Sequence, residues 1–497
     1  MAKKKLEEIK NKVIGGMIIL IGREFGMKLI SIVCQIILVR IISPEYFGLL
    51  AILVFIVNIA ELFTDIGLTQ AIVRERSAVS NQKLSVIIYI RLGLSLIAFV
   101  FVIISFPILK SIFKQLSDPH FLMIVILAST LMLKGVRNIF VAIFDKELNY
   151  RAVSRVDLSG VVTYFTVAIF LAFQGYHLWN FIFAFFAKET VELLVAWSIT
   201  KWKPVLKVSI KEITEMARFG SYLQAGSFLS FIESSIIPIA GFKLAPYNLG
   251  LLYWSQSLTN LSDALFQNYA RVAYSGMSKI QGNRKSIEKA VNKSINLLNL
   301  TSFLFILVII GYGHGLILFV VSSKWLPALP ALYWLTGSLL FMGTSITISH
   351  ALLALGKSKS VSIFTGFNIL FEVILAFTLS NLIGFVGIAI AIFLASFSQF
   401  VIYHYLAIKE SININFRKVF LEKVKVLLVA TLATFTLNLF IPFQNEFLLF
   451  LKIGLSCIVY IVLIRLFAKN DLIELFNIAD SLISSSLSSS IKRMMRI

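Results

Sequence analysis

The sequence predicts an all-α polytopic membrane protein with about fourteen transmembrane helices. Of its 497 residues, 58% are hydrophobic, and the mean hydropathy is +0.89, well above that of soluble domains. Apolar runs of about 20 residues, each long enough to cross a bilayer as a helix, recur along the chain between short polar breaks. Runs of this length exclude a β-barrel, whose strands would be about 10 residues of alternating polarity.

The predicted spans follow one another with short connections. In chain order they cover residues 14–38, 47–68, 84–109, 121–144, 157–175, 178–200, 220–242, 248–270, 294–320, 328–355, 361–380, 383–407, 424–441 and 447–467. The first run contains Arg23, Glu24 and Lys28 and no small-residue cleavage site, so we expect a helix rather than a cleavable signal peptide. Cys34 and Cys457 both lie inside spans, and we expect inert buried thiols.

The net charge of +21 follows membrane topology and does not indicate nucleic-acid binding. With the N-terminus inside, most basic residues fall on cytoplasmic segments, within 3–12, 74–83, 146–155, 201–218, 271–293, 357–359, 409–425 and 465–496. The outer segments hold only Arg40, Lys110, Lys114, Lys243, Lys324 and Lys452. This asymmetry predicts that both termini are cytoplasmic and that the basic segments contact anionic membrane lipids.

An internal match predicts two six-helix lobes. ISPEYFGLL at residues 42–50 and LAPYNLGLL at 244–252 share Pro and Gly-Leu-Leu at the same spacing, and RAVS at 151–154 matches KSVS at 359–362. We expect an N-lobe at 1–200, a linker at 201–219, a C-lobe at 220–407, two further spans within 408–467 and a basic cytoplasmic tail at 468–497. Two parallel repeats are an arrangement that supports alternating access. Residues 272–293 are predicted to form an interfacial helix.

Charged residues inside the predicted spans differ in sign between the halves. The first half carries six basic residues within its spans, namely Arg23, Lys28, Arg91, Lys134, Arg137 and Lys188. The corresponding spans of the second half hold only the acids Glu233, Asp263 and Glu372. Because an intramembrane charge is costly, it marks a function or a paired structural site. The asymmetry predicts a membrane cavity with one cationic wall suited to an anion such as pyrophosphate.

Local partners divide these basic residues. Lys28 follows Glu24 by four residues, and Lys188 precedes Glu192 by four, so each has a carboxylate on its own helix. Arg23 has no such partner, and it is the leading candidate for contact with substrate.

Three further cations leave two readings open. Lys134 and Arg137 lie on one helical face, and Glu61 and Asp65 of the second span are their candidate partners. If they pair, the group is structural, and otherwise it is a binding wall. Arg91 lies nearer the inner edge, from which a long side chain can reach the interface.

The acids suggest coupling to a proton or sodium gradient. Glu233, Asp263 and Glu372, with Glu61 and Asp65, are candidates for such coupling, although protonated carboxyl groups in helix packing are an alternative interpretation. The sequence contains no phosphate-binding glycine loop, no Cys/His metal set and no nucleophile constellation. We therefore expect neither an enzyme nor a bound cofactor or metal.

Four segments carry a resemblance to a known family. RIISPEYFG at residues 40–48, FTDIGL at 63–68, AIVR at 71–74 and FDKELNYR at 144–151 resemble Wzx-type polysaccharide flippases, the O-antigen and exopolysaccharide transporters of the MOP superfamily. The resemblance implies a V-shaped pair of lobes in the bacterial cytoplasmic membrane with a cationic cavity. It also implies transfer of undecaprenyl-pyrophosphate-linked oligosaccharide units from the inner to the outer leaflet, alongside a polymerase and glycosyltransferases. Cavity residues vary within the family, so no individual site residue is inherited.

Two other functions remain open on the sequence. A MATE-like multidrug or small-cation antiporter would favour acidic, aromatic cavities and usually twelve spans, which the basic first half and the two extra spans oppose. An integral-membrane polysaccharide polymerase or ligase would be expected to carry a sizeable outer loop, and all the outer connections predicted here are short. The sequence does not identify the glycan, which is open between O-antigen, capsule, teichuronic acid and exopolysaccharide.

Overall fold

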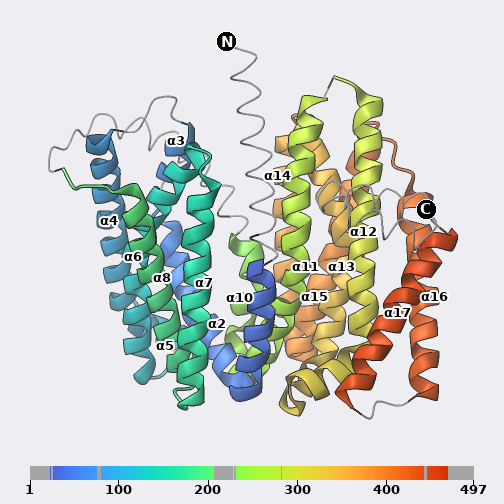
Figure 1. The fold of residues 1–497 in the computed structure, drawn as a ribbon, viewed down its shortest axis with the longest axis horizontal. Coiled ribbons are helices and arrows are strands. Elements are labelled where there is room, and N and C mark those ends of the chain that lie inside the picture. The colour runs from blue at the N-terminus through green and yellow to red at the C-terminus, as the bar shows by residue number, and fades with distance from the viewer. Residues whose placement is uncertain are drawn as a thin grey trace. The chain divides into compact units, whose positions relative to one another are not determined.

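A computed structural model describes residues 23, 26–65, 67–74, 80–205, 228, 231–280, 282–441 and 445–467 (Figure 1). The described residues form helices and connections without a β-strand, as the sequence predicts. The chain divides into two compact units, Met1–Gly250 and Leu251–Ile497. The predicted linker at 201–219 is described only up to residue 205, so the predicted lobe boundaries stay a prediction.

The first unit begins with helical residues 26–41. It continues with α2 (Pro44–Leu62), α3 (Leu68–Arg74), α4 (Asn81–Ile104), α5 (Phe106–Ile112), α6 (Pro119–Lys146), α7 (Tyr150–Phe173), α8 (Leu178–Thr200), α10 (Ile236–Ala240), a 3₁₀ turn η1 (Gly241–Lys243) and the first turn of α11. Helix starts follow local chemistry. Pro119 stands at the start of α6, where its missing N–H costs nothing, and the Asn149 side chain caps α7 by accepting a hydrogen bond from the Ala152 N–H at 3.2 Å.

Helix α6 is central to the first unit because it packs against α2, α3, α4 and α8, while α7 packs along α8 (Figure 1). A buried cluster that includes Ile139, Phe140 and Val156 holds these helices together. Trp202 belongs to the same cluster, and its indole N–H donates to the Ser85 hydroxyl at 3.0 Å. The start of the predicted linker is therefore fastened to the first unit.

The two matching Pro-Gly segments contact each other. Pro44 and Pro246 stand at the starts of α2 and α11, and one turn later Gly48 and Gly250 pack backbone to backbone. A Cβ added to Gly48 would lie 2.0 Å from the carbonyl oxygen of Pro246, and one added to Gly250 would lie 1.7 Å from that of Pro44. The contact is reciprocal, which gives a physical reason for glycine at both positions.

The second unit is built on long helices. They are α11 (Pro246–Lys279), α12 (Arg284–Gly315), the π-helical turn η2 (Leu316–Val321), the 3₁₀ turn η3 (Ser323–Ala328), α13 (Leu329–Ala354), α14 (Ser358–Ile383), α15 (Phe385–Lys409), the π-helical turn η4 (Arg417–Leu421), α16 (Glu422–Phe440) and α17 (Glu446–Phe467). The interfacial helix predicted at 272–293 is wrong. Helix α11 runs to Lys279, and Asn283 caps a new helix by accepting from the Ser286 N–H at 3.1 Å.

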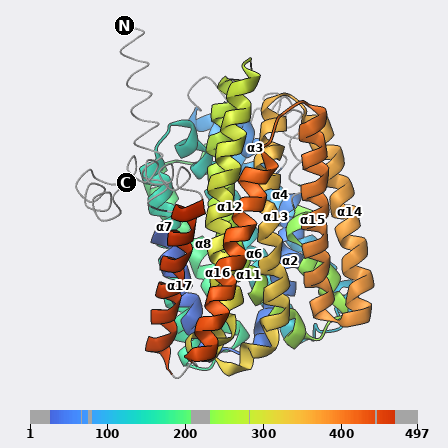
Figure 2. The ribbon, with the colours of Figure 1, turned by 90° about the vertical axis from the view of Figure 1, so that its right-hand side faces the viewer.

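Helices α16 and α17 pack against α12 and each other (Figure 2). Buried polar contacts fasten α17 to α12, since the Tyr312 hydroxyl lies 2.6 Å from the Ser456 hydroxyl and the Tyr460 hydroxyl donates to the Leu300 carbonyl at 3.0 Å. Large apolar side chains such as Leu439 and Phe440 remain exposed on α16 and α17. A lipid environment suits such a surface.

Nine helices among the described residues are long and apolar enough to cross a membrane. Helix α8 is not among them, because Lys188, Glu189 and Glu192 interrupt its apolar sequence. The number of fourteen spans is therefore approximate, and two predicted spans, 14–38 and 220–242, lie partly outside the described residues. The chain is nevertheless an all-helical integral membrane protein.

Candidate functional site

Five of the six basic residues predicted to form the cationic wall lie in ion pairs within the first unit. They meet five carboxylates, and we call these ten residues the charged cluster: Arg23, Arg91, Lys134, Arg137 and Lys188 with Glu61, Asp65, Asp157, Glu189 and Glu192. Arg23 precedes helix 26–41, Asp65 lies between α2 and α3, and the other residues come from α2, α4, α6, α7 and α8.

Arg23 pairs with Asp157 of α7, and its guanidinium nitrogen lies 2.6 Å from the carboxylate oxygen. The prediction that Arg23 has no partner considered only its own helix, and sequence reasoning missed Asp157 altogether. Asp157 is the first residue of the predicted span 157–175, where an acidic residue is expected to face the polar membrane boundary. The excess of cations over local acids was the signal that called for a partner from another helix.

Lys134 pairs with Glu61, with 3.1 Å between its ammonium nitrogen and a carboxylate oxygen, which confirms the predicted pairing across the bundle. Asp65 instead pairs with Arg91 at 3.1 Å. Asp65 also accepts hydrogen bonds from the Gly67 N–H at 3.1 Å and the Thr69 hydroxyl at 3.0 Å, so it holds the start of α3.

From its position in the sequence the Arg91 side chain could extend to the membrane interface, but it does not do so in the structure. Its side chain is only 2% exposed and packs beside Gly135 of α6. A Cβ added to Gly135 would lie 3.0 Å from Cγ of Arg91, so the small residue makes room for the arginine. Enclosure between α4 and α6, with a carboxylate in reach, holds Arg91 inside the bundle.

Arg137 lies between two carboxylates of α8. Its nitrogens are 3.1 Å from Glu189 and 3.3 Å from Glu192, and both acids are almost fully enclosed. Lys188 contacts the same two acids at 3.5 and 3.8 Å, which confirms the predicted four-residue pair with Glu192. Gly160 of α7 lets Glu192 fit, because a Cβ there would lie 1.8 Å from Oε1 of Glu192.

The charged cluster is electrically balanced. Its five cations and five carboxylates give no formal net charge, so the expectation of a purely cationic wall is wrong for these residues. Pairing explains how guanidinium and ammonium groups persist in membrane-spanning helices, where an unpaired charge is costly. By the criterion set out for Lys134 and Arg137, these ion pairs favour a structural role for the two residues, and anion binding stays a prediction.

The other predicted residues lie apart from these ion pairs. Lys28 is half-buried on helix 26–41, whereas the position of Glu24 lies outside the described residues. Glu233 is exposed in the first unit, and Glu372 is buried on α14 of the second. The side chain of Asp263 is not among those described. A role for these acids in ion coupling therefore stays a prediction.

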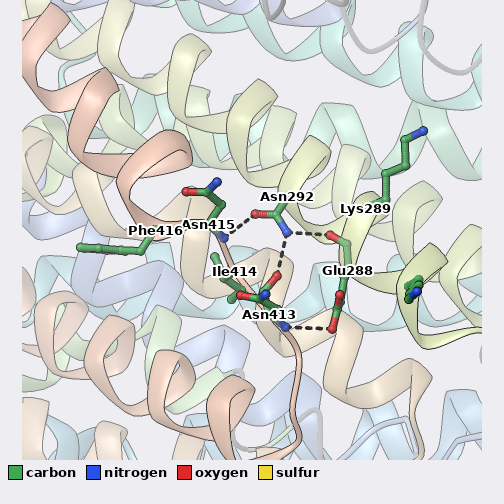
Figure 3. A pocket seen from close by; sticks show the side chains of 8 residues that line it. Glu288, Lys289, Asn292, Asn413, Ile414, Asn415 and Phe416 are labelled. Atoms are coloured by element: carbon green, nitrogen blue, oxygen red, sulfur yellow. Dashed lines mark hydrogen bonds between the residues drawn. The ribbon is translucent and has the colours of Figure 1, made fainter.

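A separate cavity of about 540 Å³ lies in the second unit between the start of α12 and the connection from α15 to η4 (Figure 3). The Asn292 amide donates to the Asn413 carbonyl at 3.0 Å and accepts from the Asn415 N–H at 2.9 Å, while Glu288 accepts from the Asn413 N–H at 3.1 Å. Lys289 points away from this network. These bonds fasten the connection to α12 and give the cavity a structural explanation.

Metal ligation receives no support from the described side chains, which contain no group of three His, Cys, Asp or Glu residues arranged to hold an ion.

Comparisons with known proteins agree with the fold and the resemblance. Lipopolysaccharide biosynthesis protein WzxC of Escherichia coli (strain K12) is 21% identical over 413 residues, which cover 79% of this chain and 80% of the relative. The structure of the lipid II flippase MurJ matches 90% of this chain and 98% of its own at 17% identity, with a TM-score of 0.73. A MATE family multidrug transporter of the MOP superfamily matches 77% and 94% at 18% identity, with a TM-score of 0.61.

The two structural matches show a MOP-type fold. The sequence match gives the family directly, since residues 37–330 match the family described as polysaccharide biosynthesis protein. The resemblance seen in residues 40–48, 63–68, 71–74 and 144–151 is thereby confirmed. This chain belongs to the polysaccharide biosynthesis protein family.

Proposed function

We propose that this protein flips oligosaccharide repeat units, linked through pyrophosphate to a polyprenyl lipid, across the bacterial cytoplasmic membrane for polysaccharide synthesis. The observation that carries the proposal is a charged cluster on membrane helices of a chain in this family, with Arg23 in it. Guanidinium groups bind phosphate oxygens through charge-assisted and often bidentate hydrogen bonds. A lipid-linked pyrophosphate is an anion that must pass the membrane interior.

The proposal includes a direction and an orientation. The basic cytoplasmic segments support cytoplasmic termini, and substrate then enters from the inner leaflet, where lipid-linked units are assembled. Alternating access through the two repeats is the expected mode of transport. Coupling to a proton or sodium gradient through Glu233, Asp263 or Glu372 is part of the same proposal.

The alternatives have less support. The fold is shared with a MATE transporter, but at 18% identity that likeness speaks only for the fold. The sequence relationships lead to proteins of polysaccharide synthesis instead. A polymerase or glycosyltransferase would be a partner of this transporter in the same assembly, and transport itself needs no catalytic residue.

The test is transport of undecaprenyl-pyrophosphate-linked oligosaccharide by the purified chain in proteoliposomes. Arg23→Gln should reduce flipping at least about tenfold, the equivalent of a lost charge-assisted contact of about 1.5 kcal/mol. Lys114→Gln, which removes an exposed charge outside the cluster, should transport normally. Wild-type flipping by Arg23→Gln would remove Arg23 from the site, and absence of flipping by the unaltered chain would contradict the proposed function.

A double variant separates binding from stability. Arg23→Gln combined with Asp157→Asn replaces the ion pair by two neutral amides, so it leaves no unpaired charge. If Arg23 binds substrate, the double variant should still fail to transport. If the pair serves only the fold, the double variant should recover transport that Arg23→Gln alone loses.

A further inference from the structure

The balanced charge of the cluster has a consequence for any anionic substrate. A pyrophosphate that reaches Arg23 meets a guanidinium whose nitrogen already lies 2.6 Å from Asp157. Asp157 contacts one terminal nitrogen, Nη1, and because Nε is buried, a phosphate that binds the guanidinium through two donors must use both terminal nitrogens. Substrate and Asp157 therefore compete for one partner. This competition presupposes the proposed function, in which a pyrophosphate reaches Arg23.

The burial of one partner, rather than of both, separates fixed from exchangeable pairs, since Asp65 and Arg137 themselves keep 24% and 17% of their side-chain surface exposed. Arg91 is 2% exposed, and its partner Asp65 also holds Gly67 and Thr69, so this pair is part of the framework. Arg137 is likewise fixed between two enclosed carboxylates of α8. An incoming anion cannot replace Glu189 or Glu192, which are 1% and 3% exposed, without opening the helix packing, whereas the more exposed Asp65 is held by its hydrogen bonds to Gly67 and Thr69.

The two other pairs remain accessible. Arg23 and Asp157 keep 14% and 28% of their side-chain surface exposed, and Lys134 and Glu61 keep 20% and 28%. Both partners of each pair can therefore be reached without unpacking α6 from α8. Asp157 comes from α7 and Glu61 from α2, whereas Lys134 comes from α6 and Arg23 precedes helix 26–41.

We propose that Asp157 is a resident counter-anion, which the pyrophosphate of the substrate displaces from Arg23 on binding. Glu61 plays the same part for Lys134. Exchange keeps each cation paired in both states, so the empty protein never holds a lone charge in the membrane. It also limits affinity, because binding gains only the difference between two ion contacts. A transporter needs that limit, since a site that binds too tightly cannot release its cargo.

Equilibrium binding of undecaprenyl pyrophosphate to the full chain in nanodiscs tests the exchange. Asp157→Asn removes the competitor and should tighten binding about fivefold, the equivalent of an ion pair worth about 1 kcal/mol. Turnover in proteoliposomes should fall, because release loses its replacement anion. Asp118→Asn is the matched control, since it removes an exposed aspartate that lies 2.6 Å from Lys110 outside the cluster, and its affinity should not change.

A double-mutant cycle distinguishes exchange from a general gain in positive charge. In an Arg23→Gln background, Asp157→Asn should no longer tighten binding, whereas a general field effect would persist and would overturn the proposal. Unchanged or weaker binding by folded Asp157→Asn, with normal binding by the unaltered chain, would also overturn it while leaving the proposed function intact. Absence of binding by the unaltered chain would contradict both.

Discussion

Gly160 shows how one residue without a side chain determines the geometry of the charged cluster. It lies on α7 one turn after Asp157, and Glu192 of α8 occupies the space where its Cβ would be. The enclosed Glu192 is held by Arg137 and Lys188 and has little room to move away. Gly160 therefore sets the distance between α7 and α8 at the cluster.

Gly160→Ala should destabilise the protein by about 2 kcal/mol, because overpacking in an enclosed site costs about that much and Glu192 must leave Arg137. Thermal unfolding in detergent would measure the loss. Gly93→Ala on α4 is the matched control, since a Cβ there meets nothing within 4 Å and should be neutral or slightly stabilising. Equal unfolding temperatures for the two variants would contradict the packing argument.

The sequence identifies charged residues far better than it pairs them. The pair Lys188–Glu192 follows from helical spacing, which is local. The pairs Arg23–Asp157 and Arg91–Asp65 depend on how helices rotate and pack, and no spacing along the chain encodes that rotation. The expectation of an unopposed cationic wall failed for this reason, although most of its residues do lie together.

Among the elements, the crossing of α2 with the first turn of α11 permits no side chain at its two glycines. Gly48→Ala or Gly250→Ala would drive a Cβ into the carbonyl group of Pro246 or Pro44, and backbone cannot move aside as a side chain can. Each variant should lose about 3 kcal/mol of stability, at the upper end of the cost of overpacking. Expression level and unfolding temperature would report the loss.

Gly276→Ala provides the control on the same helix, because a Cβ at that position of α11 meets nothing within 4 Å. If Gly250→Ala is as stable as Gly276→Ala, the two helices do not cross as closely as the geometry indicates. The internal match of the two Pro-Gly segments thus receives a mechanical explanation that the sequence alone does not provide.

Element type is easier to predict than element ends. The apolar runs predict most of the helices, because hydropathy over about 20 residues is a property of the segment itself. The polar ends of the helices are harder to predict, because hydropathy does not mark where they stop. Residues 272–293 suggest an interfacial helix, yet α11 and α12 both extend beyond their apolar spans, and the Asn283 cap divides the segment. One capping side chain decides that boundary.

At the scale of the whole molecule, the sequence predicts the fold class well and the packing of the helices poorly. An all-helical membrane protein follows from composition, and the family resemblance follows from four short segments. The charge balance inside the first unit could be recognised only from the tertiary structure, since Asp157 and Arg137 have their partners on other helices. Orientation in the membrane depends again on a property of the sequence, the distribution of basic residues.

The distribution of basic residues predicts which helix ends lie on the cytoplasmic side. Helix α5 continues α4 through Ser105, and α6, α7 and α8 then alternate in direction, so the connection that contains Lys114 and the turn between α6 and α7 lie at opposite ends of the first unit. Lys146, Arg151 and Arg155 gather at the second of these ends, which the positive-inside rule places in the cytoplasm. In the second unit, Lys359 at the start of α14 is expected on the cytoplasmic side as well.

Single cysteines test this orientation once Cys34 and Cys457 have been replaced by serine. Lys114 and Lys359 are both exposed in the structure. The distribution of basic residues predicts opposite compartments for them, so Lys114→Cys should react with a membrane-impermeant maleimide in intact spheroplasts, whereas Lys359→Cys should react only after permeabilisation. The reverse labelling pattern would show that the protein has the opposite orientation in the membrane. Inversion would place its basic segments outside, and substrate would then have to enter from the wrong leaflet, so the proposed direction of flipping depends on this result.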